Sequence, residues 1–155
     1  MPVFNKTQAS LDIIPPMIEL DNRTTLNVNE EFLNTITSTL TDKDIELIIT
    51  DEKEIQEINK AHRGVDSPTD VLSFPYEEMP MCPLGSIVIS AHHVVEISKE
   101  LGHSSDDELA LLFIHAILHL LGYDHEIDSG EMREEEIRLI EKFGLPKSLI
   151  VRTQG

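Results

Sequence analysis

Three histidines lie in one apolar stretch of this chain and restrict how that stretch can fold. They are His115, His119 and His125, and Gly122 interrupts the stretch between the second and the third. Two histidines four residues apart lie on one face of a helix, with Cβ atoms about 5–6 Å apart, so both imidazoles can reach one ion. Because glycine tolerates the left-handed conformation that ends a helix, the chain can turn back at Gly122 and bring His125 to the same ion.

This spacing is typical of a catalytic metal site. Three neutral imidazoles leave a fourth tetrahedral position for water, whereas structural zinc sites fill all four positions with protein ligands. The spacing matches the skeleton of the H-E-x-x-H-x-x-G-x-x-H signature of zinc proteases. Ala116 stands where those proteases carry their glutamate base, and alanine cannot accept a proton. We predict one Zn²⁺ per chain, held by His115, His119 and His125.

Size and cysteine usage indicate one intracellular domain. A chain of 155 residues can bury a hydrophobic core without disulfides or a structural metal, so we expect a single domain over residues 1–155. The single cysteine, Cys82, cannot form an internal disulfide, which favours a reducing compartment. The sequence opens with no leader pattern, and the apolar run over 111–121 is too short to span a membrane. We therefore expect a cytoplasmic protein that does not bind membranes.

The charge of the chain argues against general binding of nucleic acids. Its net charge is −17, from 29 acidic and 12 basic residues. Such binding depends on Lys and Arg that neutralise phosphates, so we expect no DNA partner. Lys60, His62 and Arg63 form a small basic group that leaves room for local binding.

Alternating strand and helix patterns predict an α/β (α+β) fold. The expected strands cover residues 10–20, 45–50, 69–76 and 84–90. The expected helices cover residues 29–40, 51–61, 91–101, 105–121 and 130–143. Ser105 and Glu108 form a capping box at the start of the helix that carries the histidines. Together these elements predict a small mixed sheet packed with helices. A central helix carries the metal site, as in zinc metalloproteases.

Three motifs of the sequence resemble the YbeY family of bacterial endoribonucleases. They are TDVLSFP at 69–75, LGSIVIS at 84–90 and HAILHLLGYDH at 115–125. The resemblance implies a zinc-dependent endoribonuclease that cleaves single-stranded RNA in ribosomal RNA maturation and ribosome quality control. It also implies the ribosome or ribosomal proteins as partners, and the three histidines as zinc ligands.

Arg63 falls where this family has an arginine implicated in activity. A planar guanidinium can hold two phosphate oxygens while charge builds on them. Without the resemblance, a surface arginine paired with an acid is the commoner interpretation. We predict Arg63 and His115 as catalytic residues. The proton acceptor stays open among the metal-bound water, Asp70 and His62, and Asp124 is expected to orient the loop or to accept a hydrogen bond from a ligand histidine.

Three positions depart from the family pattern, and two other functions stay open. Ala116 replaces a usual glycine, His62 a common aromatic residue and Ser86 a common aspartate. A metallopeptidase is favoured by the histidine spacing and opposed by Ala116. A non-catalytic ribosome-assembly factor with a structural zinc suits the acidic charge, because an acidic surface can meet a basic ribosomal protein.

Overall fold

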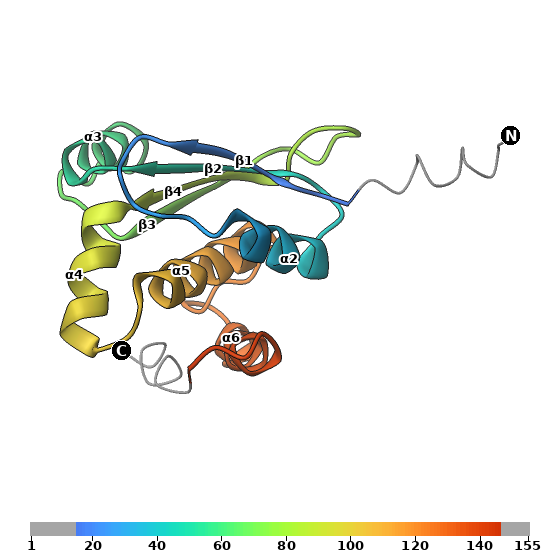
Figure 1. Ribbon diagram of the computed structural model, residues 1–155. Coiled ribbons are helices and arrows are strands. Elements are labelled where there is room, and N and C mark those ends of the chain that lie inside the picture. Colours follow the sequence, from blue (N-terminus) through green and yellow to red (C-terminus); the bar gives the residue numbers. More distant parts are fainter. Residues whose placement is uncertain (1–14, 147–155) are drawn as a thin grey trace, which may run out of the picture.

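The strands and helices follow the order expected from the sequence. The structure is a computed structural model that describes residues 15–146 (Figure 1). The strands are β1 (Ile18–Asn22), β2 (Ile45–Thr50), β3 (Val71–Pro75) and β4 (Gly85–Ser90). The helices are α2 (Glu30–Leu40), α3 (Glu52–Arg63), α4 (Ala91–Leu101), α5 (Ser105–Leu120) and α6 (Glu131–Lys142). The predicted extended segment over 10–20 lies partly outside the described residues, and its strand begins at Ile18.

The four strands form one mixed sheet in the order β1-β2-β4-β3. The central strand β2 runs parallel to both neighbours, and Ile45 lies between Ile18 of β1 and Gly85 of β4. Strand β3 runs antiparallel to β4, with Val71 opposite Ile89, and forms one edge of the sheet. β4 is buried along its whole length. These observations confirm the predicted mixed sheet packed with helices.

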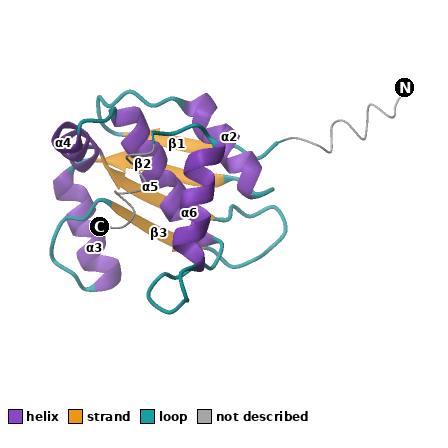
Figure 2. Cartoon of the chain, turned by 90° about the horizontal axis from the view of Figure 1, so that it is seen from below, coloured by secondary structure: helices purple, strands orange, loops and turns teal. Residues whose placement is uncertain are grey.

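Helices cover both faces of the sheet. In Figure 1, α5 and α2 lie beneath the strands, with α6 beyond α5, and Figure 2 shows the same helices from below. Helix α3 covers the opposite face, where Ile55 packs against Leu72 and Val88. The main hydrophobic core therefore lies between the sheet and α5, and a smaller one lies under α3.

Helix α5 is enclosed almost completely. Every residue from 108 to 120 is buried except His115 and His119, which are only partly buried. A helix that is apolar nearly all round is stable only where other elements surround it. The two histidines thus mark the one side of this segment that opens toward solvent. No helix within residues 15–146 is long and apolar enough to cross a membrane.

Local interactions set both ends of α5. The N-cap is Ser104, whose hydroxyl accepts a hydrogen bond from the backbone N–H three residues later, so the predicted cap at Ser105 is wrong by one residue. Two adjacent serines offer the same cap chemistry, which is why the sequence did not distinguish them. After the helix, Gly122 takes a φ of +102°, and the N–H of Tyr123 donates to the carbonyl of Leu118. The chain reverses at Gly122 as predicted.

Gly85 allows β4 and β3 to approach the end of α5. A Cβ at this position would lie 2.6 Å from the carbonyl oxygen of Phe74 and 2.7 Å from Leu120 Cδ2. We predict that Gly85→Ala lowers the free energy of unfolding by about 1–3 kcal/mol, because a paired backbone carbonyl cannot move aside. Urea denaturation of the two proteins measures the difference. Equal unfolding midpoints would contradict this close packing.

Candidate metal centre

The three histidines meet at the C-terminal end of α5. His115 and His119 extend from successive turns of the helix, and His125 comes from the loop that follows it. Their candidate ligand atoms all lie within 4.8 Å of one another. The ring centroids are 4.7 Å apart for His115 and His119, and 5.7 and 5.6 Å from these rings to His125. This arrangement is able to bind one metal ion.

Hydrogen bonds behind two of the rings determine which nitrogen faces the centre. His119 Nδ1 lies 3.1 Å from the backbone oxygen of Tyr123, and a carbonyl can only accept, so this nitrogen carries the proton. His115 Nδ1 lies 3.2 Å from Glu136 Oε2, and an ionised carboxylate also only accepts. In their neutral forms both rings therefore direct the lone pair of Nε2 toward the centre.

The distance between these two nitrogens suits a shared cation. Nε2 of His115 and Nε2 of His119 are 3.2 Å apart. Two unprotonated nitrogens at this distance repel each other unless a shared proton or a metal ion lies between them. Two ligands of a tetrahedral zinc, with bonds of about 2.0–2.1 Å, are about 3.3–3.4 Å apart. The donor set and its spacing therefore fit zinc.

The surroundings of His119 favour the form that binds metals. Burial lowers the pKa of His119 below its usual value of 6.5, the neighbouring His115 lowers it further, and the hydrogen bond to the carbonyl of Tyr123 partly opposes this shift. Only a neutral imidazole binds a metal ion. The lowered pKa therefore keeps His119 available as a ligand at neutral pH.

The histidines line a cleft of about 550 Å³ between β3 and the loop after α5. Arg63, at the end of α3, lines the same cleft, so the structure brings together the arginine and the three histidines singled out in the sequence. Ala116, at the position of the protease base, also lines the cleft and offers no proton acceptor there. The cleft therefore joins a potential metal site to a potential phosphate-binding group.

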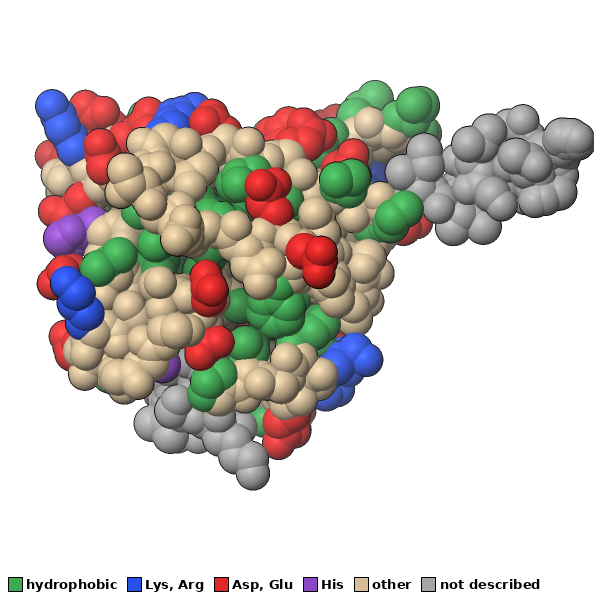
Figure 3. All heavy atoms as spheres, in the orientation of Figure 1, with side chains coloured by type: hydrophobic (Ala, Val, Ile, Leu, Met, Phe, Trp, Pro, Cys, Tyr) green, Lys and Arg blue, Asp and Glu red, His purple; other side chains and the backbone are tan. Residues whose placement is uncertain are grey.

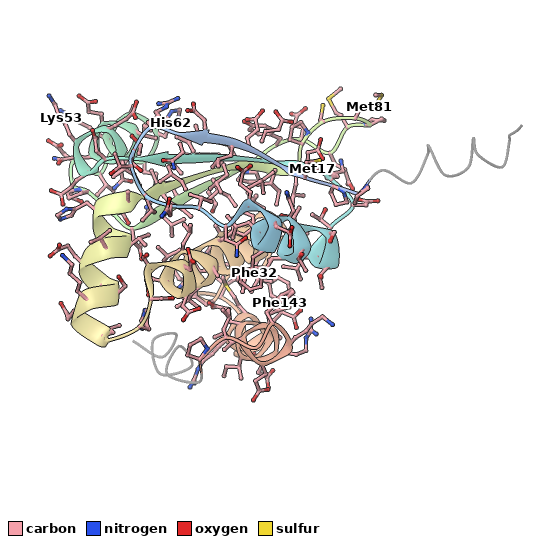
Figure 4. All side chains as sticks on the ribbon, viewed as in Figure 1. Met17, Phe32, Lys53, His62, Met81 and Phe143 are labelled. Carbon is pink, nitrogen blue, oxygen red and sulfur yellow. The ribbon has the colours of Figure 1, made fainter. Side chains whose placement is uncertain are left out.

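The two side chains considered as proton acceptors lie in different places. Asp70 lines the cleft, and its carboxylate accepts a hydrogen bond of 2.8 Å from the N–H of Val71, as expected of a residue that caps a turn. His62 is not among the residues that line this cleft. Its ring packs against Phe74, with 5.1 Å between centroids, on the side of the sheet that α3 covers. Figure 4 labels His62 close to α3. The position of His62 does not support a role in proton transfer.

Comparison with known proteins identifies the family of the chain. The family model described as Endoribonuclease YbeY matches residues 13–144. The endoribonuclease YbeY of Sulfurimonas denitrificans is 66% identical over 139 residues, which cover 90% of this chain and 100% of that protein. The chain belongs to the endoribonuclease YbeY family. The YbeY of Campylobacter jejuni is 60% identical over 126 residues, 81% of this chain and 94% of that protein.

A solved structure has a similar fold. The solution structure of TM1509 from Thermotoga maritima has 32% sequence identity to this chain and a TM-score of 0.58. The match covers 82% of this chain and 89% of that one. The resemblance to the YbeY family that the three motifs indicated is therefore confirmed, and with it an endoribonuclease family.

Asp124 has the first of its two predicted roles in this YbeY chain. Its carboxylate accepts a hydrogen bond from the N–H of Glu126, and its carbonyl accepts from Ile127 and Asp128. Asp124 thus orients the loop that carries His125. The alternative, that it accepts a hydrogen bond from a ligand histidine, is not seen for His115 or His119, whose partners are Glu136 and the carbonyl of Tyr123.

Glu136 is the site residue that sequence reasoning missed. It belongs to α6, and its side chain is only 7% exposed. A signal was present, because Glu136 shares the buried face of this amphipathic helix with Met132, Leu139 and Ile140. A carboxylate at such a position needs a hydrogen-bond partner. The partner, His115, lies 21 positions earlier in the chain, so helix periodicity alone did not reveal it.

We predict that Glu136→Leu weakens zinc binding by about 10–100-fold, because His115 loses the acceptor that orients its ring. Glu136→Gln, which keeps a carbonyl acceptor, is expected to retain most of the affinity. Competition with a chromophoric chelator measures the dissociation constants. Glu134→Leu is the matched control, since Glu134 is exposed on the same helix. Equal affinities for the two leucine variants would contradict this role of Glu136.

Proposed function

We propose that this YbeY-family chain is a zinc-dependent endoribonuclease that cleaves single-stranded RNA in ribosomal RNA maturation and ribosome quality control. The observation that carries the proposal is the cleft that contains both the three histidines and Arg63. We place the protein in the cytoplasm, with the ribosome or ribosomal proteins as partners.

The residues in and beside the cleft have different roles in phosphodiester cleavage. His115, His119 and His125 would hold the zinc ion, which when bound supplies a Lewis acid beside the scissile phosphate. Arg63 binds non-bridging phosphate oxygens and stabilises the negative charge that develops on them. Glu136 and the carbonyl of Tyr123 orient two of the imidazoles, so their geometry is set before RNA binds.

The charge of the surface restricts where a polyanion can bind. Figure 3 shows acidic side chains distributed over one face of the molecule, with few basic ones among them. Because the protein has a net charge of −17, it repels RNA except where positive charges are concentrated. Arg63 and a bound zinc ion would create such a place in the cleft. The acidic remainder suits contact with basic ribosomal proteins.

RNA cleavage by the purified protein tests the proposal. We predict that zinc-loaded protein cleaves single-stranded but not double-stranded RNA, and that a chelator or His119→Ala abolishes cleavage. Arg63→Ala is expected to lower kcat roughly 100-fold, the usual loss of one group that stabilises developing charge. Arg63→Lys restores only part of it, because an ammonium cannot bind two oxygens in a fixed fork.

Cleavage that persists in both His119→Ala and Arg63→Ala would show a contaminating nuclease and contradict the proposal. A peptide substrate tested in parallel distinguishes the proposed endoribonuclease from the metallopeptidase alternative, which requires peptide cleavage. RNA binding without cleavage at any metal concentration would favour the non-catalytic assembly factor.

A further inference from the structure

The free edge of β3 reaches the candidate metal centre. β3 is the last strand of the sheet and pairs only with β4 on its inner side. Val71, Ser73 and Pro75 of this strand line the cleft together with His115 and His119. No other described strand pairs with the outer side of β3.

The register of the sheet decides which backbone groups face outward. The carbonyl of Asp70 accepts from the N–H of Ser90, and the N–H of Tyr76 donates to the carbonyl of Leu84. In an antiparallel pair such bonds recur at every second residue. Even-numbered residues of β3 therefore bond to β4, and the odd-numbered ones direct their N–H and C=O groups toward the free edge.

These outward groups contain several acceptors but a single available donor. The N–H of Val71 already donates to Asp70 Oδ1 at 2.8 Å, and Pro75 has no N–H. The N–H of Ser73 is thus the one outward donor of β3 without an acceptor among the described residues. The carbonyls of Val71, Ser73 and Pro75 all face the edge.

We propose that this edge binds the RNA strand beside the cleavage site. The Ser73 N–H donates to a non-bridging phosphate oxygen, and the carbonyls of Val71 and Ser73 accept from ribose 2′-hydroxyls. The inference rests on the proposed function and specifies how its substrate is held. It also gives the cleft a way to select RNA, because DNA lacks the hydroxyl donor.

The donor count favours RNA over a peptide on this edge. A peptide that extends a sheet needs alternating donors and acceptors along several residues. Here Asp70 occupies one donor and Pro75 removes another, so such a ladder cannot continue. A nucleic acid needs only an isolated donor for a phosphate and acceptors for hydroxyls. Arg63 in the same cleft adds the positive charge that phosphates require.

Two variants of one residue isolate the backbone donor. Ser73→Pro removes the outward N–H at a position where an edge strand tolerates proline, and Ser73→Ala keeps it while removing the hydroxyl. Fluorescence anisotropy with a labelled single-stranded oligoribonucleotide, read on zinc-loaded protein before cleavage begins, gives the dissociation constants. We expect Ser73→Pro to bind about 10-fold more weakly than Ser73→Ala, the usual effect of losing a hydrogen bond to a charged group. Zinc content and the urea midpoint verify that both variants fold.

A second measurement needs no variant. Oligoribonucleotides with a single 2′-deoxy nucleotide at successive positions are bound to the wild-type protein. We expect weaker binding at one or two adjacent positions, and a uniform profile would overturn the carbonyl contacts. Equal binding by Ser73→Pro and Ser73→Ala, with cleavage intact, would overturn the proposed binding of RNA by the β3 edge and leave the proposed function unaffected. A wild-type protein that neither binds nor cleaves RNA would overturn both.

Discussion

Two imidazole nitrogens that face each other across 3.2 Å are the constraint on which the rest of the site depends. Each is held by a hydrogen bond from the opposite side of its ring, to a backbone carbonyl in one case and to a buried carboxylate in the other. Two lone pairs so close together are unfavourable without a cation. The fold therefore places these two nitrogens where a shared proton or a metal ion is favourable, and the third imidazole makes the group able to hold a metal ion.

The fold supplies this constraint by enclosing α5. The sheet, α2 and α6 surround the helix, which leaves His115, His119 and the small Ala116 as its residues that line the cleft. Helix α6 does more than cover the core, because Glu136 orients His115. At the N-terminus of α6, the carboxylate of Asp128 accepts hydrogen bonds from the N–H groups of Gly130 and Met132, which joins this helix to the loop that carries His125. Packing and metal-site geometry thus depend on the same elements.

Interactions close in sequence were accessible to prediction, whereas those between distant elements were not. The spacing of His115, His119 and Gly122 fixes a helix face and a turn, so local geometry was enough to bring the histidines together. The role of Glu136 depends on how α6 packs against α5, which no periodicity encodes. His62 adjoins Arg63 in the sequence, but only Arg63 lines the cleft, whereas the ring of His62 packs against Phe74. The outward N–H of Ser73 followed only from the register between β3 and β4.

We propose that the three imidazoles bind one zinc ion and leave one coordination position open. X-ray absorption at the zinc edge, on protein loaded with one equivalent of zinc, measures the ligands of the metal. We expect three nitrogen ligands with imidazole scattering at about 2.0–2.1 Å and one additional oxygen ligand. A sulfur ligand from Cys82, or fewer than three imidazoles at the metal, would contradict it.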